Sequence, residues 1–265
     1  CDINRMHLPQ VITAAFDHPR KCQQIALVFR QVIRYAVESR NLPAGAFDEI
    51  CGNISLPKYQ KSLKRGLTEA ERKAVKTADF TDRERCFVYL IYYLGLRREE
   101  ALGLRPIDSD MKSKTVHIRQ ALIFNNNDPE IKKPKSQNSI RNIPMPDELY
   151  TFLCAYLPTC TDHLVTTASG KAMTKSAYRK MWDSILRKMN QAAGGTDHVK
   201  VITGLTAHIF RHNYCTQLCY QVPEISLNTI ARLLGDSRQM VVNVYSHIQE
   251  ERENVVQAVE NAVNL

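Results

Sequence analysis

The sequence predicts a mainly α-helical protein with one small antiparallel β-sheet, an α+β fold. Most apolar residues recur at spacings of three and four, which is the period of a helix that buries one face. Residues 105 to 144 instead alternate, as in Thr115–Ile118 and Ile140–Pro144, which indicates half-buried strands. A chain of 265 residues, 44% of them hydrophobic, can form one large or two modest domains with a sizeable core.

The charge balance favours a polyanionic partner. Lys and Arg together number 36 against 27 Asp and Glu, a net charge of +9, and nucleic acid is the simplest such partner. A basic protein without that partner is the alternative. The eight cysteines form no C-x-x-C pair, which favours a reducing cytoplasm and gives little support to a metal site. We find no signal peptide and no apolar run near 18 residues, so we expect no membrane partner.

The N-terminal part is interpreted as a fragment of a helical bundle. Helical periodicity covers residues 7 to 16 and 21 to 39, and two helices alone bury little apolar surface. Residues 1 to 45 are therefore expected to be part of a small helical domain, and the start at Cys1 suggests a longer protein. Residues 46 to 66 contain Pro57, Gly66 and several basic residues, which predicts a basic linker.

A second domain is expected from residue 67 to residue 265. Thr68 and Glu71 form a capping-box pattern that predicts a helix start. The helix at 82–94 is apolar nearly all round and should be central. Gly95 ends it, and another helix begins at once. Residues 125 to 129 read as a loop between strands, of which we expect about three. The other expected helices are 69–78, 147–157, 174–193, 207–220, 226–235, 237–244 and an amphipathic tail helix, 250–263.

The stretch from Leu205 to Ile248 carries the residues best suited to chemistry. His208 and Arg211 are three positions apart, so on a helix they share one face and can reach the same phosphate. Arginine suits phosphate because its planar fork matches the oxygen geometry and keeps its charge. Tyr245 follows a helix that Gly235 should end. A tyrosine beside a bound phosphate can attack it as a nucleophile.

These residues resemble, together and in order, the conserved boxes of the tyrosine recombinases, the phage integrase family. The later box is matched by His208-Ile-Phe-Arg211-His212, then Leu234-Gly235, then Tyr245-Ser246-His247. The family's first box, G-L-R-x-x-E, is matched by Gly95-Leu96-Arg97 and Glu100. The resemblance covers residues 67 to 250. Residues 1 to 45 match only in kind, as the end of the family's helical core-binding domain, which binds DNA.

The resemblance implies a catalytic set drawn from separate elements. Arg97 and Arg211 would clamp the scissile phosphate of DNA, and Tyr245 would attack the phosphorus to give a 3′-phosphotyrosine. His208 would assist proton transfer at the tyrosine, and Lys135 would protonate the leaving 5′-oxygen. Strand exchange replaces one phosphodiester by another, so no cofactor and no metal are expected.

Neighbouring residues receive supporting roles under the same resemblance. Glu100 would brace the site, although Arg97 and Glu100 alone could equally be a surface ion pair. His212 is a second candidate for structural support. Lys135 lies in a K-S-x-x-S-x-R-x-I-P setting that resembles the family's β-hairpin, with the alternative that this lysine only anchors phosphates. The DNA-binding candidates are Lys132, Lys133 and Arg98.

Asp236 departs from the family pattern, which has His or Trp after Leu-Gly. An ionised carboxylate cannot donate a hydrogen bond and would repel a phosphate. Three roles are open: Asp236 could be protonated beside that charge, could brace Arg211, or could cap the helix that starts at Ser237. His212 and His247 are the candidates to compensate.

The predicted function is a site-specific recombinase or integrase of a mobile element, such as a phage or conjugative transposon. It would act on double-stranded DNA in the bacterial cytoplasm, at the nucleoid, with its two domains closing around the duplex. Self-association into a synaptic tetramer is expected, with the tail helix as a candidate contact. The alternatives are a type IB topoisomerase-like enzyme and a non-catalytic DNA-binding relative.

Overall fold

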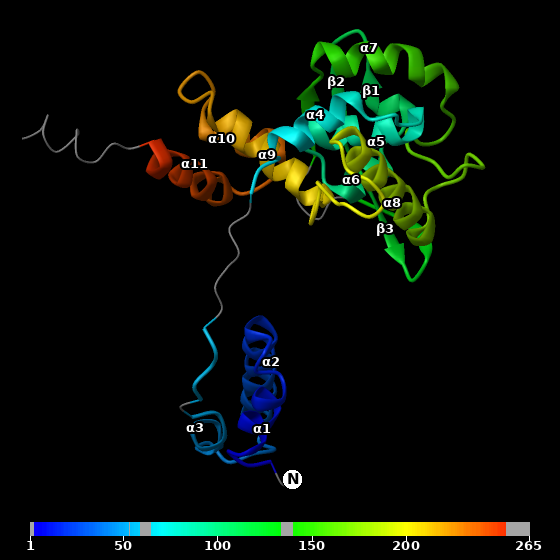
Figure 1. Cartoon of the computed structure of the whole chain (residues 1–265). Coiled ribbons are helices and arrows are strands. Elements are labelled where there is room, and N and C mark those ends of the chain that lie inside the picture. Colours follow the sequence, from blue (N-terminus) through cyan, green and yellow to red (C-terminus); the bar gives the residue numbers. More distant parts are fainter. Residues whose placement is uncertain (1–2, 53, 59–64, 134–139, 253–265) are drawn as a thin grey trace, which may run out of the picture. The chain divides into compact units, whose positions relative to one another are not determined.

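The computed structural model describes residues 3–52, 54–58, 65–133 and 140–252 of the chain, which divides into two compact units, 1–63 and 64–265 (Figure 1). The mainly helical fold with small antiparallel sheets agrees with the fold class that the sequence predicts. In the described ranges, no helix is both long enough and apolar enough to cross a membrane.

In its described residues, the first unit contains three helices, α1 (His7–Ala14), α2 (Pro19–Glu38) and α3 (Ala46–Cys51). One apolar cluster joins Leu8 and Ile12 of α1 to Cys22 and Ala26 of α2. A second cluster joins α2 to α3, where Ile50 is buried. The expected linker at 46–66 therefore begins too early, because α3 packs on α2 and belongs to the helical unit. The short apolar pattern of α3 gave too few turns to reveal a helical period.

The second unit is built around α5 (Asp82–Tyr93), which contacts α6, α7 and α9. The predicted capping box at Thr68 is confirmed: its side chain accepts from the backbone N–H of Glu71, and the Glu71 carboxylate accepts in return. The described residues of this unit include two short 3₁₀ helices, η1 (Pro106–Asp108) and η3 (Leu157–Thr159). The remaining helices are α4 (Glu69–Thr77), α6 (Arg98–Gly103), α7 (Asp147–Tyr156), α8 (Lys175–Ala192), α9 (Ala207–Cys219), α10 (Leu227–Leu234) and α11 (Arg238–Arg252).

The strands form a three-stranded antiparallel sheet in the order β1–β2–β5 and a separate hairpin, β3–β4. Their bounds are β1 (Ser109–Asp110), β2 (Thr115–Ile118), β3 (Ala121–Asn125), β4 (Asp128–Lys132) and β5 (Arg141–Pro144). Ile118 of β2 pairs with Arg141 of β5. The expected loop at 125–129 is instead a tight hairpin turn, with Asn126 at a φ of 56°. The mostly exposed strand β4 carries little apolar alternation, which is why the sequence did not indicate it.

Gly95 lets the chain turn sharply from α5 into α6. Its φ is +59°, and a Cβ atom there would lie 2.3 Å from the ring of Tyr214 on α9. Only glycine accommodates both the left-handed backbone and this close approach. The turn places Arg97 at the N-cap position of α6, directly beside the helices that carry the later motif.

Within the second unit, helices α9, α10 and α11 form an apolar cluster of their own, whose buried members include Cys215, Ile230 and Val241. Gly235 ends α10 in the left-handed conformation, as its sequence context predicts, with a φ of +61°. The next helix is longer than expected: α11 runs without interruption from Arg238 to Arg252 and contains Tyr245. Residues 250 to 252, where the tail helix was expected to begin, therefore belong to α11, and the rest of that tail lies outside the described residues.

Candidate active site

Arg97 and Arg211 meet at one carboxylate oxygen. Arg97 Nη2 donates to Asp236 Oδ2 at 3.1 Å, and Arg211 Nη2 donates to the same oxygen at 3.0 Å. The two arginines come from α9 and from the N-terminal end of α6, far apart in the sequence. The fold therefore brings together two guanidinium groups around a single anionic atom.

Backbone carbonyls fix both guanidinium groups from behind. Arg211 Nη1 donates to the carbonyl of Gly95 at 2.9 Å, and Arg211 Nη2 donates to that of Leu234 at 2.6 Å. Arg97 Nη2 donates to the carbonyl of Gly235 at 3.0 Å. Arg211 is almost completely buried, with 3% of its side chain exposed. Burial lowers the pKa of Arg211 and the charge of Arg97 lowers it further, opposed by nearby carboxylates. The helix-ending turns at Gly95 and Gly235 thus supply the acceptors that hold the site.

Glu100 braces the arginine pair from the protein side. Its carboxylate accepts from the backbone N–H of Arg97 and from Arg97 Nη1, both at 2.9 Å. It also accepts from Arg141 Nη1 at 2.9 Å and Arg141 Nη2 at 2.8 Å. Burial acts to raise the pKa of Glu100, but the hydrogen bonds and charge of Arg141 dominate and hold it below the usual value. Glu100 therefore carries a charge inside the protein, and the ion pair with Arg97 that the sequence suggested is present at the site.

Asp236 is ionised in this arrangement. Burial acts to raise its pKa, but the hydrogen bond from Arg211 and the charges of both arginines hold it below the usual value. Its second oxygen, Oδ1, accepts from the backbone N–H of Ser237 at 3.1 Å. Of the three roles open from the sequence, the geometry disfavours a protonated Asp236. It shows contacts compatible with the other two, bracing Arg211 and starting the next helix.

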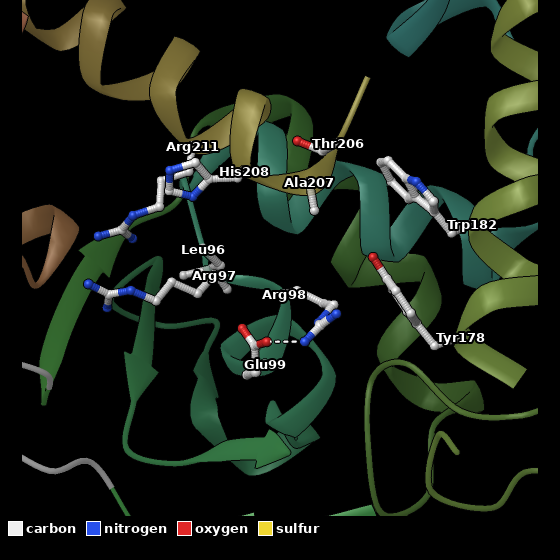
Figure 2. Close-up of a pocket in the computed structure, with 10 residues that line it drawn as sticks. All are labelled: Leu96, Arg97, Arg98, Glu99, Tyr178, Trp182, Thr206, Ala207, His208 and Arg211. Atoms are coloured by element: carbon white, nitrogen blue, oxygen red, sulfur yellow. Dashed lines mark hydrogen bonds and ion pairs between the residues drawn. The ribbon is translucent and has the colours of Figure 1, made fainter. Parts of the chain in front are cut away.

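A cavity of about 460 Å³ opens beside the arginine pair. Figure 2 shows Arg97 and Arg211 extending in the same direction from different elements, with the ring of His208 next to Arg211. The opposite wall is aromatic, formed by Tyr178 and Trp182 of α8. The cavity is lined by Leu96, Arg97, Arg98, Glu99, Tyr178, Trp182, Thr206, Ala207, His208 and Arg211. A cationic and an aromatic wall together suit a phosphate group attached to an apolar or stacking group.

Arg98 is held within the cavity wall and does not extend freely into solvent. Its guanidinium lies over the rings of Phe124 and Tyr178, with centroid distances of 5.7 and 5.3 Å, and pairs with Glu99. Cation–π contacts and the ion pair both orient the side chain. Its position beside the arginine pair keeps it a DNA-binding candidate.

Tyr245 lies on α11, half-buried against the cluster of α9, α10 and α11. Its hydroxyl accepts a hydrogen bond from Gln249 Nε2 at 2.5 Å. It is not among the residues that line the cavity of Arg97 and Arg211. The structure thus brings Arg97, Arg211, His208, Glu100 and Asp236 together and places the tyrosine on a neighbouring helix.

The other sequence candidates lie at several positions. Lys132 and Lys133 are exposed at the end of the β3–β4 hairpin. Lys135 lies outside the described residues. His212 is half-buried on α9, with its Nδ1 atom 3.4 Å from the hydroxyl of Thr216, and His247 is exposed on α11. Among the residues whose placement is described, no group of three or more His, Cys, Asp or Glu is arranged to hold a metal ion.

Sequence reasoning did not assign Arg141, the buried partner of Glu100. Its side chain is 1% exposed, and its Nε atom donates to the carbonyl of Leu233 at 2.7 Å. An arginine on the inward-facing side of an alternating strand was the signal that could have revealed it. Trp182 packs edge-on against Phe87 and Phe210 and also lines the cavity.

The mainly helical unit thus holds two arginines and a histidine around a position that one anionic oxygen fills. This arrangement is typical of proteins that bind a phosphate group. The model of the phage integrase family matches residues 63–252, and the chain belongs to this family.

Curated relatives carry names from the same family. "Tyrosine recombinase XerC-like" of Caldanaerobacter subterraneus subsp. tengcongensis is 27% identical over 217 residues, 72% of this chain and 52% of that protein. "Tyrosine recombinase XerA" of Thermococcus kodakarensis is 25% identical over 209 residues, 77% of this chain and 65% of that protein. The chain therefore spans about half to two thirds of the length of these relatives.

Solved structures share the fold. The Tn1549 transposon integrase, solved in complex with a circular intermediate DNA, matches with a TM-score of 0.73 and 17% identity, over 95% of this chain and 86% of that chain. The XerH site-specific recombinase, solved bound to a palindromic difH substrate, matches with a TM-score of 0.66 and 18% identity, over 100% of this chain and 72% of that chain. At these identities the likeness concerns the fold alone.

Proposed function

We propose that the chain is the catalytic part of a site-specific DNA recombinase or integrase of a mobile element. The observation that carries this proposal is the meeting of Arg97 and Arg211 on one oxygen position beside His208. Two guanidinium groups that share one acceptor can bind two oxygens of a single phosphate when DNA replaces that acceptor. The names of the relatives, tyrosine recombinases and a transposon integrase, support the same activity.

In the proposed reaction the Tyr245 oxygen attacks the scissile phosphorus while the bond to the 5′-oxygen breaks. Arg97 and Arg211 offset the charge that builds on the non-bridging oxygens. His208 assists removal of the tyrosine proton, and Lys135 protonates the leaving 5′-oxygen. The products are a 3′-phosphotyrosine and a 5′-hydroxyl, and a 5′-hydroxyl from another strand reverses the step. The number of phosphodiester bonds is conserved, so no cofactor is needed.

The hydroxyl of Tyr245 must leave Gln249 and reach the phosphate in this proposal. DNA binding is proposed to bring α11 into that position. Double-stranded DNA is the partner, with Arg98, Lys132 and Lys133 as further phosphate contacts. We also propose a synaptic tetramer on DNA, with the C-terminal tail as one contact, and action in the bacterial cytoplasm at the nucleoid.

Covalent trapping tests the proposal. Duplexes retained by the chain from a random library would be sequenced, and the consensus duplex would be made with nicks at successive positions. A nick close to the scissile phosphate lets the 5′-hydroxyl fragment diffuse away, so the adduct persists on a denaturing gel. The wild type should form an adduct that blocks digestion from the 3′ end. Arg211→Lys keeps the charge but loses the fork, and should slow adduct formation by about 10²–10³-fold.

Matched tyrosine variants separate the outcomes. Tyr245→Phe should form no adduct, whereas Tyr220→Phe, from the same apolar cluster, should form it at the wild-type rate. An adduct from Tyr245→Phe would reject the assigned nucleophile. Retention of DNA without any adduct would favour a non-catalytic DNA-binding protein. Relaxation of supercoiled DNA without exchange between two duplexes would favour the topoisomerase-like alternative.

A further inference from the structure

Asp236 occupies the position that an anionic ligand of Arg97 and Arg211 would take. A single carboxylate oxygen, Oδ2, accepts from both guanidinium groups, at 3.1 and 3.0 Å. A carboxylate oxygen and a non-bridging phosphate oxygen have similar charge and accept the same hydrogen bonds from arginine. The side chain of this protein therefore fills the place of a ligand oxygen.

Each of the two arginines has hydrogen bonds other than those to Asp236. Arg211 is anchored to the carbonyls of Gly95 and Leu234, at 2.9 and 2.6 Å. Arg97 is anchored to the carbonyl of Gly235 at 3.0 Å and to Glu100 at 2.9 Å. These contacts would persist without the carboxylate. A bracing role would leave Asp236 redundant, so its charge between the arginines calls for a different explanation.

The position of Asp236 allows its side chain to rotate away from Arg97 and Arg211. It lies in the short turn between α10 and α11. Its side chain is 29% exposed, and the side chain of Arg97 is 36% exposed. Arg211, in contrast, is buried. The solvent-facing side of the pair is therefore formed by Asp236 and Arg97, and rotation of the aspartate side chain toward water uncovers both guanidinium groups.

We propose that Asp236 is an internal competitor, which occupies the anion position of Arg97 and Arg211 until a phosphate displaces it. That the phosphate belongs to DNA rests on the proposed function. With the carboxylate in place, the charges of the two arginines are partly offset, so a stray anion binds weakly. A phosphate that is also held by other DNA contacts displaces Asp236 and gains both guanidinium groups. The site then discriminates in favour of phosphates that arrive on correctly bound DNA.

Binding of inorganic phosphate to the full chain tests the competitor directly and needs no DNA site. Titration calorimetry at constant ionic strength would compare the wild type with Asp236→Asn, which keeps the shape and removes the charge. The variant should bind phosphate roughly tenfold more tightly, equivalent to about 1.4 kcal/mol. Unchanged or weaker binding would overturn the proposal and favour a bracing role.

A carboxylate of the same cavity provides the control for general charge effects. Glu99 lines the cavity, pairs with Arg98 and is 32% exposed, close to the exposure of Asp236. Glu99→Gln breaks the ion pair with Arg98 but touches neither Arg97 nor Arg211, so it should raise phosphate affinity less than about threefold. Equal gains for both variants would overturn the proposal.

Two further outcomes keep the test decisive. Asp236→Ser is a second variant that removes the carboxylate. If neither Asp236→Asn nor Asp236→Ser folds, the carboxylate is needed for folding, and the proposal is overturned. The covalent adduct is a separate measurement. Tighter phosphate binding by Asp236→Asn, together with no DNA adduct from the wild type, would support the competitor and reject the recombinase activity.

Discussion

Removal of the charge of Glu100 should destabilise the second unit by about 3–5 kcal/mol, because a buried ion pair would be broken. Glu100 and Arg141 are 7% and 1% exposed, and two hydrogen bonds of 2.8 and 2.9 Å join them. Glu100→Gln removes the charge that accepts these two hydrogen bonds from the buried Arg141 guanidinium. Arg141→Met should cost a similar amount, since the buried carboxylate loses two of its hydrogen bonds and the nearest buried charge. The double variant should lose clearly less than the sum, because neither charge is then stranded.

Urea unfolding monitored by tryptophan fluorescence measures these changes in the free energy of unfolding of the second unit. The sequence has a single tryptophan, and Trp182 packs in the core of the second unit, so its emission reports that unit. Glu99→Gln is the matched control, since it removes an adjacent, partly exposed carboxylate and should change stability by no more than about 0.5 kcal/mol. Additive losses in the double variant would refute the claim that Glu100 and Arg141 form one buried unit.

Two further predictions concern the surroundings of the site. Gly95→Ala should destabilise by more than Gly204→Ala, because both glycines have positive φ but only a Cβ at Gly95 would clash, at 2.3 Å from Tyr214; thermal unfolding checks this, and equal losses would contradict it. Glu84 lies in the first turn of α5. Burial acts to raise the pKa of its carboxyl group, but hydrogen bonds from Lys188 and from the N-cap residue of α5 hold this pKa at about 2, below the ordinary 4.5. The ionised carboxylate therefore contributes stability that is present above pH 4.5 and lost as the pH falls toward 2, on the order of 3 kcal/mol. Acid titration of Glu84→Gln should lack this loss, and a profile like the wild type would reject the assignment.

Local rules explain which parts of the fold the sequence predicted. The Thr68 capping box and the Gly235 stop each depend on a few neighbouring residues, so their elements start and end as expected. Helix α3 and strand β4 were missed because one is a single short apolar pattern and the other is mostly exposed. Their existence depends on packing against α2 and β3, which no local pattern reports.

The site shows the same division. Spacing alone places His208 and Arg211 on one helical face, and the structure has both in one cavity. Pairing Arg97 with Arg211 came from the family resemblance, since residues so far apart meet only through the tertiary fold. A brace on Arg211 was one of three roles that the sequence left open for Asp236. That Asp236 joins Arg97 to Arg211, and that Arg141 is buried, were not predicted, because each depends on which carbonyls and carboxylates the turns at Gly95 and Gly235 bring near.

The residue that becomes covalently linked to DNA identifies the nucleophile. The trapped adduct would be digested with nuclease and trypsin, and its peptides sequenced by mass spectrometry. The tryptic peptide from residue 239 to residue 252 contains Tyr245 as its one tyrosine, beside Ser246 and His247. We expect the phosphonucleotide on Tyr245. A nucleotide on Ser246, on His247 or on any other peptide would contradict it.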